Sequence, residues 1–94
     1  MDTLSFEDWE RLDDRSTQVV LRGVSHEQLA IALAPVSDSF KDHIYRNMSE
    51  RAVGVLKSDM TEKSPVAEAD SATKQREIEA VMEHYRAAGE LQFR

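Results

Sequence analysis

The chain of 94 residues has no cysteine, only three glycines and two prolines, and no long apolar run. Without cysteine it can form no disulfide, thiol nucleophile or cysteine-ligated zinc site. Nothing in the sequence indicates an oxidising compartment, so we expect a cytoplasmic location. No apolar stretch approaches the roughly 18–20 residues that a membrane-spanning helix needs, and the acidic start MDTLSFEDWE does not fit a signal peptide.

Basic charge is also scarce, because twelve Lys and Arg stand against eighteen Asp and Glu, for a net charge of −6. Binding to phosphates needs a concentrated basic surface, so this balance argues against nucleic acid as a partner. Hydrophobic residues make up 40% of the chain and charged residues 32%, which is typical of a folded domain. At this length we expect one domain, covering residues 1–94.

What the sequence does contain is helical periodicity along almost its whole length. Helix-capping residues precede the apolar segments, and we expect helices to begin after Ser5, Asp13 or Asp14, Ser25, Ser37 and Ser49. The longest helix should run from Ala67 or Asp70 to Ala88, followed by a left-handed cap at Gly89. Only the terminal ELQFR could be extended. The prediction is an all-α fold, a compact array of five or six short helices with a long C-terminal helix.

Apolar residues at helical spacing predict which side chains form the core. The residues of these stripes are Leu29, Ala32, Leu33, Phe40, Ile44, Met48, Ile78, Val81, Met82 and Tyr85. The aromatic residues Trp9, Tyr45 and Phe93 are widely separated and lack basic neighbours in the pattern of a base-stacking surface. We therefore expect them to be core or domain-edge anchors.

Patterns that carry catalysis or bind metal are missing from the sequence. The histidines His26, His43 and His84 stand apart, without a second ligand at metal spacing on the same helical face. We expect all three to be surface or boundary residues. Helix capping accounts for the adjacent carboxylates Asp13 and Asp14, and the glycines form no phosphate-binding loop. The sequence predicts a protein that is not an enzyme and uses no cofactor or metal.

One expected helix, from Ser49 to Glu62, carries charges of both signs on one face. At about 100° per residue, Ser58 and Glu62 fall within about 20° of Arg51, and Asp59 lies about 80° to one side. The opposite arc is apolar and consists of Ala52, Leu56 and Met60. We expect the apolar arc to be buried and the four polar residues to face solvent. Periodicity alone leaves open whether they form a plain solvated surface or bind a partner.

Five segments occur in order from about Phe6 to Leu91: FEDWERLDDRSTQVVLRGVSHEQLAIAL, IYRNMSERA, LKSDM, PV and AGEL. In residue identity and spacing these segments resemble the C-terminal domain of the bacterial flagellar motor switch protein FliG. The resemblance implies an all-helical rotor domain at the cytoplasmic side of the flagellar basal body. In that family one charged helix faces the cytoplasmic loop of the stator protein MotA and passes torque through opposite charges. Contact with the switch protein FliM is also implied, although the segments that join the family to FliM are not in this chain.

The resemblance assigns the stator-facing helix to the segment from Ser49 to Glu62. Arg51 in MSERA matches an arginine of that helix, and Asp59 in KSDM matches the second of two acidic positions. Three other charges of the family are replaced, by Ala34, Ser58 and Ala67. Because Glu62 lies on the same line as Arg51, we expect it to substitute in part for the missing charge. The family's hinge phrase before FED is reduced to TLSF.

Two functions remain open at this stage. In the first, the chain is a rotor domain that contacts the stator through Arg51 and Asp59, with Glu62 and Ser58 on the same surface, and so supports torque and motility. In the second, the chain is a stand-alone interaction module that keeps the fold but has lost the torque function. The three replaced charges, and a Met1 at the edge of the domain, favour the second interpretation.

Overall fold

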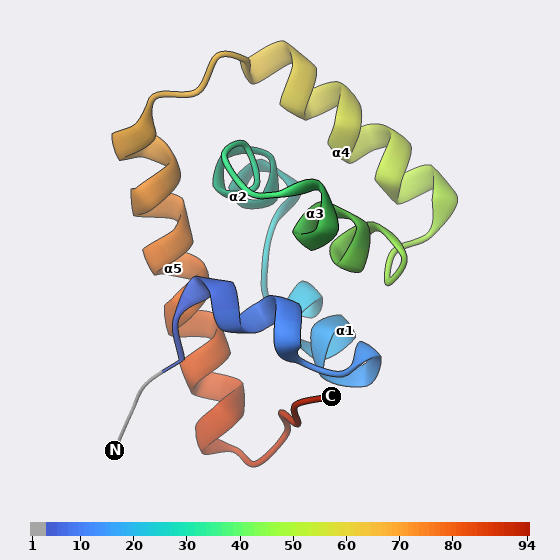
Figure 1. Cartoon of the computed structure of the whole chain (residues 1–94), viewed down its shortest axis with the longest axis vertical. Helices are drawn as coiled ribbons and strands as arrows, with labels where there is room; N and C mark the ends of the chain where they lie inside the picture. Colours follow the sequence, from blue (N-terminus) through green and yellow to red (C-terminus); the bar gives the residue numbers. More distant parts are fainter. Residues whose placement is uncertain (1–3) are drawn as a thin grey trace.

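The fold is described by a computed structural model that covers residues 4–94. Six helices form within this range, and no strand does: η1 (Phe6–Arg11), α1 (Asp14–Arg22), α2 (His26–Ala32), α3 (Asp38–Tyr45), α4 (Glu50–Lys63) and α5 (Glu68–Ala87) (Figure 1). The first is a 3-10 helix and the others are α-helices. The all-α prediction with a long C-terminal helix is confirmed. Thr3, the first residue of the TLSF phrase, lies outside the described residues.

The helices begin where the sequence offers capping side chains. In the capping box of α2, the Ser25 N–H donates to the Gln28 side chain at 2.9 Å, and the Gln28 N–H donates to the Ser25 hydroxyl at 3.1 Å. The hydroxyls of Ser37 and Ser49 cap α3 and α4 by accepting from the Phe40 and Ala52 N–H groups, without the reciprocal bond. Of the two candidate aspartates, Asp13 is the cap of α1. Local hydrogen bonding therefore sets most of the helix starts.

The short helix α2 forms the centre of the fold, between α4 and α5, and makes its most extensive contacts with these two helices. The last carbonyls of a helix have no partner inside it. Here α5 supplies partners: the Ser71 hydroxyl donates to the Ile31 carbonyl at 2.9 Å, and the Gln75 amide donates to the Ala32 carbonyl at 3.0 Å. The end of α2 is therefore fixed by side chains about 40 residues further along the chain.

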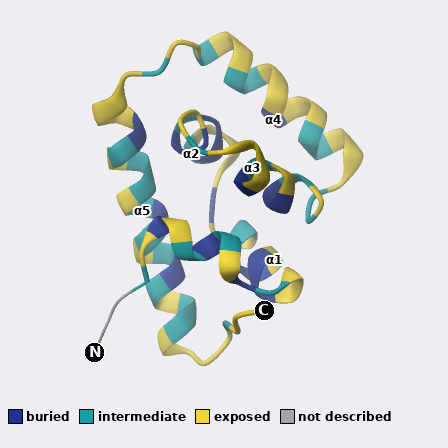
Figure 2. Ribbon diagram, viewed as in Figure 1, coloured by how far each residue is buried: buried dark blue, intermediate teal, exposed yellow. Residues whose placement is uncertain are grey.

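Every helix contributes to one hydrophobic core (Figure 2). Its N-terminal part is aromatic: the ring centroids of Phe6, Trp9 and Phe40 lie 5.1 to 6.4 Å apart and join η1 to α3. The expected stripes supply half of the remaining buried hydrophobic residues, namely Leu29, Ala32, Leu33, Ile44, Ile78 and Met82. Met48, Val81 and Tyr85 of the same stripes are only half-buried.

Gly23 marks the place where the end of α1 meets α5. A Cβ atom at this position would lie 2.8 Å from Cγ1 of Val81 and 3.3 Å from the ring of Tyr85. Because real Cβ atoms do not approach other heavy atoms so closely, the packing of α1 on α5 requires glycine here. Gly89, with φ of 77°, takes the left-handed conformation predicted for it.

One expectation about the histidines was wrong. His26 and His84 are exposed, but His43 is buried, with only 3% of its surface accessible. Its Nε2 lies 2.8 Å from the hydroxyl of Thr17, also buried, so the ring has a polar partner inside the domain. His43 faces α1. Because its partner Thr17 is 26 residues away, no local sequence pattern indicates that the ring is buried.

The C-terminal residues are extended, as the sequence allowed, and lie beside the segment between η1 and α1. The Asp13 N–H donates to the Gln92 carbonyl at 2.9 Å, and the Arg94 N–H donates to the Arg11 carbonyl at 2.8 Å. Phe93 is half exposed, with the Arg11 guanidinium 4.9 Å from its ring centroid. It is therefore an anchor at the domain edge.

Candidate protein-interaction surface

Helix α4 lies along one edge of the molecule, with one side against the core and the other exposed to solvent (Figures 1 and 2). Leu56 is completely buried, and Ala52 and Met60 on the same arc are half-buried. The helix begins at Ser49, whose hydroxyl accepts from the Ala52 N–H at 3.1 Å. Burial of this arc fixes the rotation of α4, so its opposite face must point to solvent.

The four residues predicted for the interaction surface lie on this outward part of α4. Arg51, Ser58 and Glu62 are exposed, and Asp59 is half-buried at the flank. Arg51 and Glu62 are eleven residues apart, which corresponds to about 16 Å along the helix axis. Among the described residues, none of the three charged groups forms an ion pair. Their charges are therefore available to a second molecule.

The signs of two of these charges oppose the helix dipole. Acidic groups stabilise the first turn of a helix and basic groups the last, by about 0.3–1 kcal/mol each. Glu50 and Lys63 follow this rule in α4. Arg51 and Glu62, which lie beside them in sequence, do the reverse. The stability of the helix therefore does not account for the charges on the outward face.

Sequence reasoning missed two exposed residues near the middle of α4. Val55 is 46% exposed and lies about 40° around the helix from Arg51. Gly54, the preceding residue, lies about 60° to the other side of Arg51 and has open space around the position of a Cβ atom, with nothing within 4 Å. The available signal was an apolar residue on an arc that is otherwise polar, which the search for charges passed over.

Lys57 is directed toward α3 instead of the outward face. Its Nζ lies 4.9 Å from the ring centroid of Tyr45, and the Tyr45 hydroxyl donates to the sulfur of Met60 at 3.5 Å. Burial raises the pKa of Tyr45, and the carboxylates of Asp42 and Asp38 act in the same direction. The phenol therefore stays neutral and Lys57 binds to its ring as a cation.

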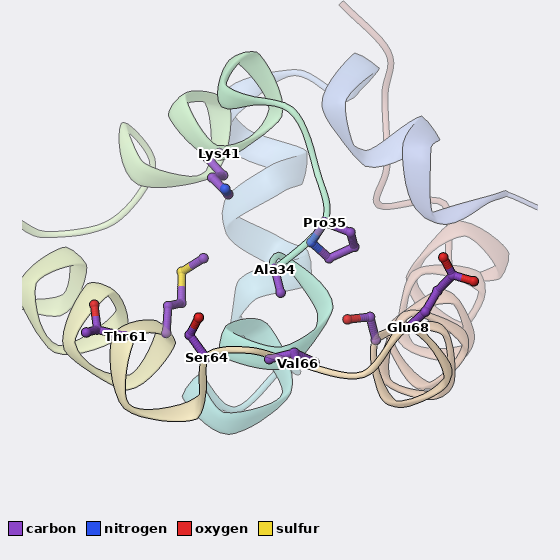
Figure 3. A pocket seen from close by; sticks show the side chains of 9 residues that line it. Ala34, Pro35, Lys41, Thr61, Ser64, Val66 and Glu68 are labelled. Carbon is purple, nitrogen blue, oxygen red and sulfur yellow. The ribbon is translucent and has the colours of Figure 1, made fainter.

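A pocket of about 650 Å³ lies beside the C-terminal half of α4 (Figure 3). It is lined by Ala34, Pro35, Lys41, Met60, Thr61, Ser64, Val66, Glu68 and Ser71. Figure 3 shows Ala34, in the turn after α2, close to Val66 from the segment before α5. Ala34 and Ala67, which follows Val66, occupy two positions that are charged in the family resembled by the sequence, and both are exposed. Both replaced positions therefore lie near the end of α4.

Other kinds of site have little support in this part of the chain. Residues 4–94 contain no group of three or more His, Asp or Glu that could hold a metal ion. None of the helices within the same range is long and apolar enough to cross a membrane. What α4 presents is a set of charges of both signs that form no ion pair among the described residues.

Comparisons with known proteins identify relatives over nearly the whole chain. The model of the FliG C-terminal domain family matches residues 2–93. The chain is 42% identical to the flagellar motor switch protein FliG of Thermotoga maritima over 86 residues, and 38% identical to that of Borreliella burgdorferi. These alignments cover 92% of this chain and 26% and 25% of the two relatives. The chain thus spans about a quarter of the length of the curated relatives it matches.

Solved structures agree with the sequence comparison. Residues 86–343 of FliG from H. pylori match with a TM-score of 0.91 at 26% identity, over 95% of this chain and 42% of that one. Full-length FliG from Aquifex aeolicus matches with a TM-score of 0.86 at 29% identity, over 92% of this chain and 27% of that one. The resemblance noted in the sequence and the predicted fold are both confirmed.

Proposed function

Because this chain belongs to the FliG C-terminal domain family of flagellar motor switch proteins, we propose that its helix α4 contacts the cytoplasmic loop of the stator protein MotA. Arg51 and Asp59 carry this contact, Glu62 adds negative charge, and Ser58 lies between them. The domain then works at the cytoplasmic side of the basal body, together with switch proteins such as FliM. Family membership also supports the expectation that the chain is not an enzyme.

The observation that carries the proposal is the state of the charges on α4. Arg51 and Glu62 lie on the outward face and Asp59 at its flank, none of the three has an ion-pair partner in the described part of the chain, and Arg51 and Glu62 oppose the helix dipole. Charges placed in this way steer a partner of complementary charge and form transient pairs with it. Torque would pass through such pairs without any bond being broken, and salt would weaken them.

The replaced charges favour the second candidate, a stand-alone interaction module without the torque function. Ala34, Ser58 and Ala67 are all exposed, so a long charged side chain would fit at each position. Their neutrality is therefore a property of this sequence that packing does not impose. A domain with fewer charges would bind the stator more weakly, or would bind a different motor component.

The test is charge reversal in the motor of the bacterium that encodes the chain. We expect Arg51→Glu and Asp59→Lys to reduce swimming or to change its direction, and a reversed charge in the MotA loop to restore it. Arg15→Glu is the matched control, because Arg15 is exposed and is the second residue of α1, as Arg51 is of α4. Normal motility with both reversals would exclude the torque function and favour the stand-alone module.

A further inference from the structure

We propose that the contact surface on α4 is not purely ionic, and that Val55 and Gly54 form an apolar docking point for a helix of the partner. This inference rests on the proposed function and adds which kinds of side chain the partner presents to α4. Three observations carry it: the exposure of Val55, the unexplained glycine beside it, and the order of charges on either side.

Val55 stands out among the large hydrophobic residues. Within residues 4–94, only Val55 and Phe93 are exposed to this degree, at 46% and 50%. Phe93 has the guanidinium of Arg11 above its ring, whereas Val55 faces outward from the middle of α4. It lies about 6 Å along the axis from Arg51 and at the same distance from Asp59. A partner that pairs with either charge would therefore also cover Val55.

Gly54 has no role that the domain itself explains. Glycine inside a helix costs roughly 1 kcal/mol relative to alanine, and α4 is a regular helix of 14 residues. The positive φ of Gly89 is not found at Gly54. Unlike Gly23, Gly54 has no neighbour that a Cβ atom would strike. The missing side chain lies about 60° around the helix from Arg51, on the side away from Val55, where it lowers the surface and lets another backbone come close.

The sequence of charges defines the partner segment. Along α4 the outward face reads positive at Arg51, apolar at Val55, and negative at Asp59 and Glu62. The complementary segment is a helix of about three turns that presents an acidic, an aliphatic and a basic side chain in that order. Salt screens the ionic contacts but not the apolar one. Binding should therefore have a salt-sensitive part and a salt-resistant part.

The experiment measures binding of the purified chain to a synthetic peptide of the MotA cytoplasmic loop, at low and at high salt. We expect Val55→Ser to weaken binding by about tenfold at both salt concentrations, since a buried aliphatic contact is lost. Val55→Ile should retain binding. Arg51→Glu should weaken binding mainly at low salt. Gly54→Ala should weaken binding several-fold and yet raise the thermal stability of the domain, a combination that a purely structural role would not produce.

The outcomes separate this inference from the proposed function. Wild-type binding by Val55→Ser and Gly54→Ala, with Arg51→Glu still defective, would overturn the apolar docking point and leave the charge contact in place. Absence of binding by the wild-type chain at low salt would overturn both. A dimer of the chain that Val55→Ser dissociates, seen by sedimentation, would assign the face to a second copy and also overturn the inference.

Discussion

The hydroxyl of Thr17 on α1 lies 2.8 Å from Nε2 of His43 on α3, and both side chains are buried. The Asn47 side chain donates to the His43 carbonyl at 2.9 Å, so this region of α3 is held through main chain and side chain. Burial lowers the pKa of His43 from its usual 6.5, and the guanidinium groups of Arg94 and Arg46 act in the same direction. The folded domain therefore favours the neutral imidazole at this position.

The free energy of unfolding should decrease as the pH falls below 6.5. Unfolded His43 takes up a proton near its usual pKa of 6.5, whereas folded His43 takes one up only at lower pH, since the opposing effect of Asp14 and Glu10 is smaller. The unfolded state then binds more protons, and stability is lost between the two pKa values. Denaturant unfolding between pH 7.5 and 5.5 measures the slope. An NMR titration of His43 with a midpoint at or above 6.5 would contradict the prediction.

Gly23→Ala should destabilise the domain by about 1–3 kcal/mol, because the new methyl group would overlap with Val81. Gly54→Ala is the matched control: it adds the same methyl group in open space and should raise stability by about 1 kcal/mol. Denaturant unfolding of both variants compares them directly. Adding Val81→Ala to Gly23→Ala should cost less than the two single changes together; strict additivity would show that the overlap is not the cause.

Ser71→Ala and Gln75→Ala should each lower stability by about 1 kcal/mol, because each removes a hydrogen bond to the end of α2. Hydrogen exchange should then increase first at the amides of the last turn of α2. Thr73→Ala is a suitable control, because its hydroxyl donates to a carbonyl of its own helix, at Ala69. Equal effects from all three changes would argue against a special role for the two caps.

Arg51→Glu should separate stability from function. An acidic residue in the first turn of α4 agrees with the helix dipole, so the purified domain should become more stable by about 0.3–1 kcal/mol. Arg15→Glu in the first turn of α1 should have a similar effect on stability. Only the change in α4 should impair stator binding. Thermal unfolding combined with peptide binding tests this, and a destabilised Arg51→Glu domain would show that Arg51 has a structural role.

Much of the fold could be predicted because its signals are local. A serine such as Ser25 or Ser49 caps a helix that begins one residue later, so the start of that helix needs no information from elsewhere. The same holds for α4, where the positions of Leu56 and Arg51 on opposite arcs follow from helical geometry alone. The contact role of the residues on that outward arc stays a prediction.

The features that could not be predicted come from contacts between distant segments. His43 is buried because Thr17 on another helix faces it, and Gly23 is required because Val81 passes close by. Neither pairing leaves a periodic pattern in the sequence. Val55 is a different case: its position about 40° from Arg51 follows from helical geometry, but the prediction for that arc rested on charge alone.

The central position of α2 has a mechanical consequence. Because α4 contacts the domain chiefly through α2, much of a sideways push on α4 would reach α5 through a helix of only seven residues, with the connection of residues 64–67 as a second route. The end of α2 is held to α5 by the hydrogen bonds from the Ser71 and Gln75 side chains. The resistance of α4 to a load should therefore depend on the packing of Leu56 in the core and on these two hydrogen bonds.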